Sequence, residues 1–120
     1  MQQPQLKRGR VQLMEETLLN QCERLLVSSD SRGNYPLLIQ DQLRDAAINQ
    51  LANTQSEKAE LGALWSNVLK KLTQNKSYQT SREEIGNCIK CVLPVEMRSG
   101  LQEGIKKRAE SVERAKRASP

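Results

Sequence analysis

Apolar residues recur at helical spacing across positions 36–72, and this pattern limits the fold more than any other feature of the chain. Residues three or four positions apart share one face of a helix, so each such stripe indicates a helix with one buried face. A polar stretch at 53–56 separates two stripes, which together predict a helical hairpin. The first stripe consists of Leu37, Ile39, Leu43, Ala47 and Leu51, and the second of Leu61, Leu64, Trp65, Val68 and Leu72.

The ends of this hairpin carry residues that favour helix starts. Pro36 suits a first helical position because its φ is already helical and the missing N–H would have no partner there. Ser56 is predicted to cap the second helix, with Glu57 and Glu60 near its positive end. The only tryptophan, Trp65, lies on the second stripe. We therefore expect the hairpin to form the core of the protein.

Three further helices are predicted around the hairpin. The first spans 11–26, where apolar residues again recur at spacings of three and four. Thr80 and Ser81 each precede a glutamate by three residues, which is the capping-box spacing and predicts a short helix ending before Pro94. The last helix is expected from about 94 to 115. No segment alternates as a strand does, so the prediction is an all-α fold of about five amphipathic helices around a central hairpin.

Length and composition indicate one domain with a small core. The chain has 120 residues, and its apolar fraction of 37% is below the usual ~45–50%. Predicted boundaries give a flexible basic arm at 1–10, a helical domain at 11–109 with the hairpin 36–72 as its core, and a basic C-terminal tail at 110–120. Only three residues are aromatic, which argues against a protein that stacks single-stranded bases on aromatic rings.

The charges are distributed unevenly along the chain. Lys and Arg number 19 against 14 for Asp and Glu, a net charge of +5. Residues 1–10 hold three bases and no acid, residues 11–69 hold four bases and eight acids, and residues 70–120 hold twelve bases and six acids. Such asymmetry is informative about partners. It predicts nucleic acid, of unknown type, or an acidic protein partner, and a homo-oligomer is possible because the centre of a second copy is acidic.

Most enzymatic chemistry is disfavoured by the residues present. The chain has no histidine, hence no imidazole base or metal ligand, and its glycines do not form a phosphate-binding loop. Cys88 and Cys91 form a CxxC, but only Cys22 remains to complete a thiolate set, and zinc needs four ligands. Cys88 fits an apolar helix face better. We therefore expect no enzyme activity, no cofactor and no metal site.

One arrangement suggests DNA binding. The predicted helices around Pro94 could form a helix-turn-helix-like pair in 80–108. Such a pair would bring five cations near a phosphate backbone: Lys90, Arg98, Lys106, Lys107 and Arg108. The joint lacks a well-placed glycine, and Pro94 is unusual there. Ordinary packing of two consecutive helices is the alternative.

The resulting hypothesis is a small non-enzymatic regulatory protein that binds nucleic acid through basic terminal segments. The alternative is a helical adaptor or chaperone-like partner whose amphipathic helices complete a bundle with another chain. Neither a membrane-spanning run nor a signal peptide is recognisable, which predicts a cytoplasmic protein, or a nuclear one in a eukaryote, with no membrane contact. The predicted nucleic-acid-binding residues are Lys7, Arg8, Arg10, Lys90, Arg98, Lys106, Lys107, Arg108, Arg114, Lys116 and Arg117.

Overall fold

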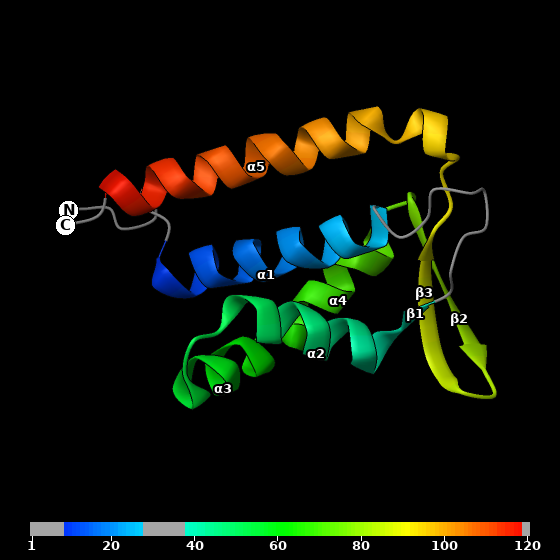
Figure 1. The fold of residues 1–120 in the computed structure, drawn as a ribbon, viewed down its shortest axis with the longest axis horizontal. Helices are drawn as coiled ribbons and strands as arrows, with labels where there is room; N and C mark the ends of the chain where they lie inside the picture. Colours follow the sequence, from blue (N-terminus) through cyan, green and yellow to red (C-terminus); the bar gives the residue numbers. More distant parts are fainter. Residues whose placement is uncertain (1–8, 28–37, 119–120) are drawn as a thin grey trace.

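The computed structural model describes residues 9–27 and 38–118 (Figure 1). Within these ranges the elements follow one another as helices and strands of unequal length. Their order is α1 (Arg10–Val27), β1 (Leu38–Ile39), α2 (Gln40–Leu51), α3 (Gln55–Ala63), α4 (Trp65–Gln74), β2 (Tyr78–Glu83), β3 (Gly86–Cys91), the 3₁₀ turn η2 (Val95–Met97) and α5 (Ser99–Ala118).

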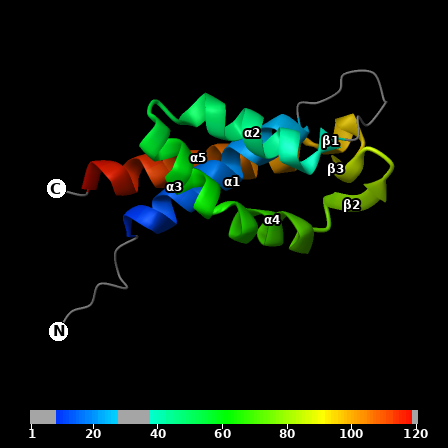
Figure 2. The same ribbon diagram turned by 90° about the horizontal axis from the view of Figure 1, so that it is seen from below.

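Helix α1 lies at the centre of the molecule. It runs between α5 and α2 in Figure 1, and Figure 2 shows α2 and α4 on opposite sides of it. Leu18, Cys22 and Leu26 recur every four residues and are 0% exposed, so one face of α1 is completely covered. The sequence predicted this helix and the burial of Leu18 and Cys22 correctly, but Val11, expected on the same apolar face, is 59% exposed. Helix α1 therefore contacts each of α2, α4 and α5, although it precedes the predicted hairpin in the sequence.

The predicted hairpin is present with different boundaries. Its first helix, α2, begins at Gln40 instead of Pro36, because Leu38 and Ile39 form β1. Its second helix is interrupted at Leu64, whose N–H bonds to the carbonyl of Leu61 at 3.0 Å and closes a tighter turn between α3 and α4. The cap is Thr54, whose side chain accepts from the Glu57 N–H, and not the predicted Ser56. Trp65 is buried as expected.

The all-α prediction is wrong because residues 78–91 form a β-hairpin. Strands β2 and β3 pair antiparallel, and β1 adds to the other side of β3, giving the order β1-β3-β2. Gly86 follows the two loop residues and adopts φ +128, a conformation that residues with a side chain rarely take. The protein is therefore mainly helical with a small antiparallel sheet at one end, a mixed class (Figure 1).

The capping-box spacing at Thr80 and Ser81 was misleading, since both residues lie in β2. In a strand, neighbouring side chains point to opposite faces. Ile89 and Cys91 face the helical core with Tyr78, whereas Ile85, expected on the same apolar face, is 65% exposed at the loop. A capping interaction does form elsewhere in the chain, where the Glu57 N–H donates to the Thr54 hydroxyl.

Helix α5 is continuous across the boundary predicted at 109/110. It ends at Ala118, and Val112 is 5% exposed, so part of the expected tail packs against the rest of the protein. Most of the predicted basic arm lies outside the described residues. None of the described helices has the length and apolar character needed to cross a membrane.

Candidate anion-binding face

Among the predicted nucleic-acid-binding residues that the structure describes, Arg98 is the most deeply buried. Its side chain is enclosed just before α5, and the residue is 2% exposed. Nε donates to the carbonyl of Leu93 at 2.9 Å and Nη1 donates to the carbonyl of Val27 at 2.8 Å. Val27 is the last residue of α1, where carbonyls lack helical partners. Arg98 therefore ties the end of α1 to the start of α5 and is not placed to contact phosphate.

Arg108 also forms hydrogen bonds with groups inside the protein. Nη1 donates to the Glu23 carboxylate and to the Asn20 amide oxygen, at 3.0 Å for the latter. The Tyr78 hydroxyl donates to the other Glu23 oxygen at 2.6 Å. Burial and the Glu23 carboxylate raise the pKa of Tyr78 above its ordinary value. Glu23, Asn20, Tyr78 and Arg108 thus form a buried polar cluster that joins α1, β2 and α5.

The positions of Arg10 and Lys90 do not suggest a binding site. Arg10, the first residue of α1, forms an ion pair with Glu60 of α3, which raises the pKa of the guanidinium and lowers that of the carboxyl. Both groups are at the surface, where such pairs contribute little. Lys90 is half-buried on β3 opposite Gln79. Lys7 and Arg8 lie outside the described residues.

The remaining five predicted residues lie along α5. All are exposed, and none of them forms a salt bridge with another described residue. Three exposed glutamates, Glu103, Glu110 and Glu113, lie among them and reduce the local positive charge. The five cations are Lys106, Lys107, Arg114, Lys116 and Arg117.

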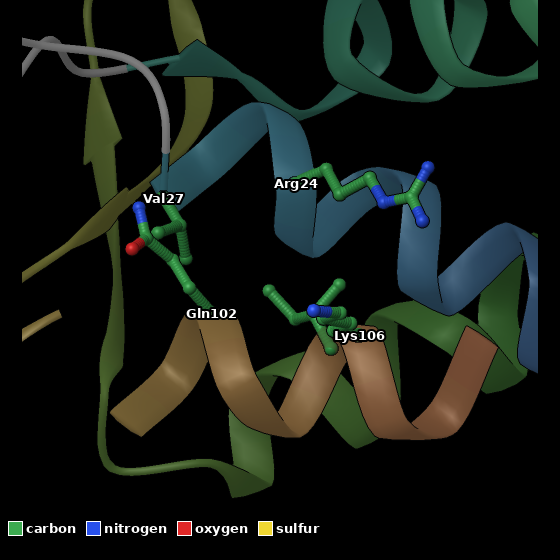
Figure 3. A pocket seen from close by; sticks show the side chains of 5 residues that line it. Arg24, Val27, Gln102 and Lys106 are labelled. Atoms are coloured by element: carbon green, nitrogen blue, oxygen red, sulfur yellow. The ribbon is translucent and has the colours of Figure 1, made fainter. Parts of the chain in front are cut away.

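A groove between α1 and α5 brings a sixth cation near one of these five. Its volume is about 350 Å³, and it is bordered by Arg24, Val27, Gln102, Ile105 and Lys106. Figure 3 shows α5, α1 and α2 in succession, with Gln102 reaching from α5 toward Val27 and with Arg24 extending from α1. Val27 and Ile105 are buried and form the apolar floor. Arg24 and Lys106 therefore stand on opposite sides of one groove.

A second hollow continues this groove toward the end of α5. It has a volume of about 230 Å³ and shares Arg24 with the first, and its border also includes Lys116 and Glu113. Because α1 and α5 run antiparallel, the cations of α5 follow the length of α1. We call the five exposed cations of α5 together with Arg24 the basic face.

Arg24 was missed because residues 11–69 are acidic on balance. The available signal was its position in the predicted helix at 11–26, off the apolar stripe and thus facing solvent. Only the packing of α5 against α1 shows that it adds to the C-terminal cations.

The helix-turn-helix hypothesis is excluded by the fold. A helix-turn-helix needs two consecutive helices, and residues 78–91 are strands. Lys90 lies on β3, and Arg98 is enclosed, so neither belongs to a recognition helix. Only α5 remains as a helix with exposed basic residues in this region.

The cysteines are buried and separate. Cys88 and Cys91 are an odd number of positions apart on one strand, so their side chains point to opposite faces of the sheet. They do not converge as a CxxC ligand or redox pair would. Cys22 lies in α1 at 0% exposure, and burial raises the pKa of its thiol to about 12, with the charge of Glu23 adding to the rise. Such a thiol is unreactive near neutral pH.

Comparisons with protein-family models, with curated protein sequences and with solved structures give no significant match to this chain.

Proposed function

We propose that this protein is a small non-enzymatic nucleic-acid-binding protein, with the basic face as its contact surface. The observation that carries the proposal is a set of six exposed cations on the α1–α5 pair, none of them bound to a carboxylate among the described residues. Three of them, Arg24, Lys106 and Lys116, border the two hollows between these helices. Cations already held by internal partners, such as Arg98 and Arg108, are not part of this surface.

The dimensions of α5 suit a phosphate backbone. A helix rises 1.5 Å per residue, so Lys106 and Arg117 are separated along the axis by about 16 Å, roughly half a turn of a DNA duplex. Exposed lysines and arginines can follow phosphates over this distance without reading bases. The neighbouring glutamates oppose this attraction. We therefore expect weak binding that does not depend on sequence, with Kd around 10⁻⁴–10⁻⁶ M.

Salt dependence tests this proposal. Binding of a short duplex DNA and a short duplex RNA is measured by fluorescence anisotropy over a range of salt concentrations. Each phosphate contact contributes about −0.9 to the slope of log K against log salt, because binding releases condensed counterions. The Lys106→Gln/Lys107→Gln variant should make the slope shallower by up to about 2.

A matched control removes the same charge elsewhere. Lys58 of α3 and Lys70 of α4 lie outside α5, and Lys58→Gln/Lys70→Gln lowers the net charge by the same amount. This variant should bind nearly as the parent protein does. The proposal fails if the parent does not bind at low salt, or if both double variants weaken binding equally.

The adaptor alternative receives less support from the packing. This alternative requires apolar helix faces that another chain would cover, but the stripes of α1, α2 and α4 meet in a single core within this protein. The large apolar side chains that remain most exposed among the described residues belong to Val11, Ile85 and Met97, which lie in three separate parts of the chain.

A further inference from the structure

Strand β2 forms an outer edge of the sheet. It spans six residues, pairs with β3 on one side only, and has no described strand on the other. All six positions pair with β3 in an unbroken register from Tyr78–Cys91 to Glu83–Gly86, so no bulge disturbs it. It also contains no proline. Proteins commonly use bulges and prolines to stop edge strands from pairing with other chains, and β2 has neither.

The hydrogen bonds of the hairpin show which backbone groups point outward. The Val92 N–H donates to the Ser77 carbonyl at 2.8 Å, and antiparallel pairs alternate between bonded and non-bonded positions. Gln79, Ser81 and Glu83 therefore direct their backbone groups at β3. Thr80 and Arg82 direct theirs away from the sheet.

Tyr78 also directs its backbone groups away from β3, but one of the two already has a hydrogen-bond partner. Its N–H donates to the Asn75 carbonyl at 3.1 Å, which leaves its carbonyl as an outward acceptor. The free edge thus offers two donors and three acceptors. Gln79, Thr80, Arg82 and Glu83 are all exposed around it, so another strand can approach.

We propose that β2 pairs antiparallel with β2 of a second copy of this chain, joining two three-stranded sheets into one of six strands. Thr80 lies opposite Thr80 of the second copy, on the two-fold axis. Thr80 then exchanges two hydrogen bonds with its counterpart, and each Arg82 N–H donates to the Tyr78 carbonyl across the interface. The interface is closed because the same edge is used on both sides.

Charge selects this register and favours a second copy as the partner. Pairing Thr80 with Thr80 brings Lys76, in the turn before β2, to the same end as Glu84 in the hairpin loop of the other copy, and this occurs twice. A shift by two residues in one direction places Lys76 opposite Arg82, and the same shift in the other direction separates Lys76 from Glu84. A larger shift in that second direction places Arg82 opposite Arg82. Like charges directly opposite each other destabilise a strand pair. The edge is therefore self-complementary in the register with Thr80 at the centre.

Concentration-dependent measurements on the full chain test the pairing. Sedimentation velocity should show a monomer that becomes a dimer as concentration rises. Amide hydrogen exchange should slow at Thr80 and Arg82 over the same range, by about tenfold when nine-tenths of the chains are paired. The amides of Ser81 and Glu83, which already bond to β3, serve as internal controls. A monomer at all concentrations, or exchange at Thr80 and Arg82 that does not change, would overturn the proposal.

Charge reversal distinguishes this interface from any other. Lys76→Glu or Glu84→Lys alone should weaken the dimer, because each places two like-charged pairs at its ends. The double variant should dimerise as the parent does, and a mixture of the two single variants should form heterodimers. A change that only perturbed the fold would not be rescued in this way. Dimers that ignore all these substitutions would mean that the copies meet at another surface.

Thr80→Pro provides a separate check. It removes the outward N–H but none of the bonds to β3, and proline is accepted on edge strands at such positions. The variant should keep its circular dichroism spectrum and lose the dimer. This inference does not depend on nucleic-acid binding, since a failure of either leaves the other unchanged.

Discussion

Lys107 and Arg108 are neighbours in α5, and their environments are opposite. Arg108 points toward α1, where Glu23 and Asn20 hold its guanidinium. Lys107 is exposed on the outer side. Adjacent residues on a helix point about 100° apart, so one basic run supplies both an internal partner and a surface charge. The number of bases in a segment therefore overstates the charge available to a ligand.

The inner side of α5 carries an electrostatic contribution to folding that the outer side lacks. Glu23 is 3% exposed and accepts hydrogen bonds from two different elements, Tyr78 of β2 and Arg108 of α5. A buried carboxylate is tolerated only with such partners. The cluster thus requires α1, β2 and α5 to assemble in one arrangement.

Glu23→Ala should have the largest effect of the variants that test this contrast. It leaves Arg108 and the Tyr78 hydroxyl without their acceptor in a buried region, and removing one member of a buried ion pair costs about 3–5 kcal/mol. The free energy of unfolding is measured by urea denaturation. Because the Arg108 side chain is 32% exposed and can turn partly to water, a value near the lower limit is expected.

Glu113→Ala is the matched control on the outer side. Glu113 is exposed on α5, and its loss should change the free energy of unfolding by no more than about 0.5 kcal/mol. Equal effects at Glu23 and Glu113 would show that the two sides of α5 do not differ as described.

Tyr78→Phe should have an intermediate effect. It removes only the hydroxyl that donates to Glu23 at 2.6 Å and keeps the buried ring. A hydrogen bond to a charged group contributes about 1.5–3 kcal/mol, so a loss of about 2 kcal/mol is expected. If Glu23 is first changed to Ala, the additional cost of Tyr78→Phe should fall close to zero. A cost that persists would place the tyrosine contribution outside the cluster.

The sequence was sufficient to predict the helices that have one buried face. Spacings of three and four identified α1, α2 and much of α4 and α5 because burial on one side imposes that period on a helix. Their ends were less predictable. Leu64 fits the apolar stripe as well as its neighbours do, and nothing in its identity reveals that α3 stops there.

The sheet was missed because a short strand can imitate a helix stripe. Ile85, Cys88, Ile89 and Val92 recur at helical spacing, yet they lie in a loop, a strand and the residue after it. β3 is buried on both faces at Cys88 and Ile89, so it lacks the alternation expected of a half-buried strand. The available signal for a turn was Gly86, close to the junction of the two segments that form β2 and β3.

The basic face was predictable only in part. Five of its six members were identified from the excess of bases near the C-terminus. Arg98 and Arg108 come from the same basic region, but their roles depend on one carbonyl, of Val27, and one carboxylate, of Glu23, that α1 contributes. Those partners are 71 and 85 residues away, and only tertiary packing defines them.

Alkaline pH should lower the free energy of unfolding through the buried thiol of Cys22. Its thiol has a pKa of about 12 in the folded protein against an ordinary value of 9.0. Above pH 9 the unfolded chain releases this proton while the folded chain keeps it, so the folded state binds more protons and stability falls as pH rises. The slope for one thiol is at most about 1.4 kcal/mol per pH unit.

Cys22→Ala measures this contribution. The variant should show a flatter decline in the free energy of unfolding between pH 9 and pH 12 than the parent protein. A residual decline is expected because the pKa of Tyr78 is also raised. Identical slopes in the two proteins would contradict the assignment of the high pKa to the buried Cys22 thiol.

Removing an exposed cation of α5 should have the smallest effect on stability. Comparing this change with the loss of Arg108 is the most informative test of the contrast between the two environments on α5. Lys107→Ala removes a charge with no partner among the described residues, so the free energy of unfolding should change by no more than about 0.5 kcal/mol. Arg108→Ala, one residue along, should destabilise by several times more because it leaves Glu23 buried with only Tyr78 as a donor. Polyanion binding should reverse this order, since Lys107 is free to contact phosphate and Arg108 is not. If Lys107→Ala destabilised the protein as much as Arg108→Ala, the exposed cations would be part of the fold and not a surface available to a ligand.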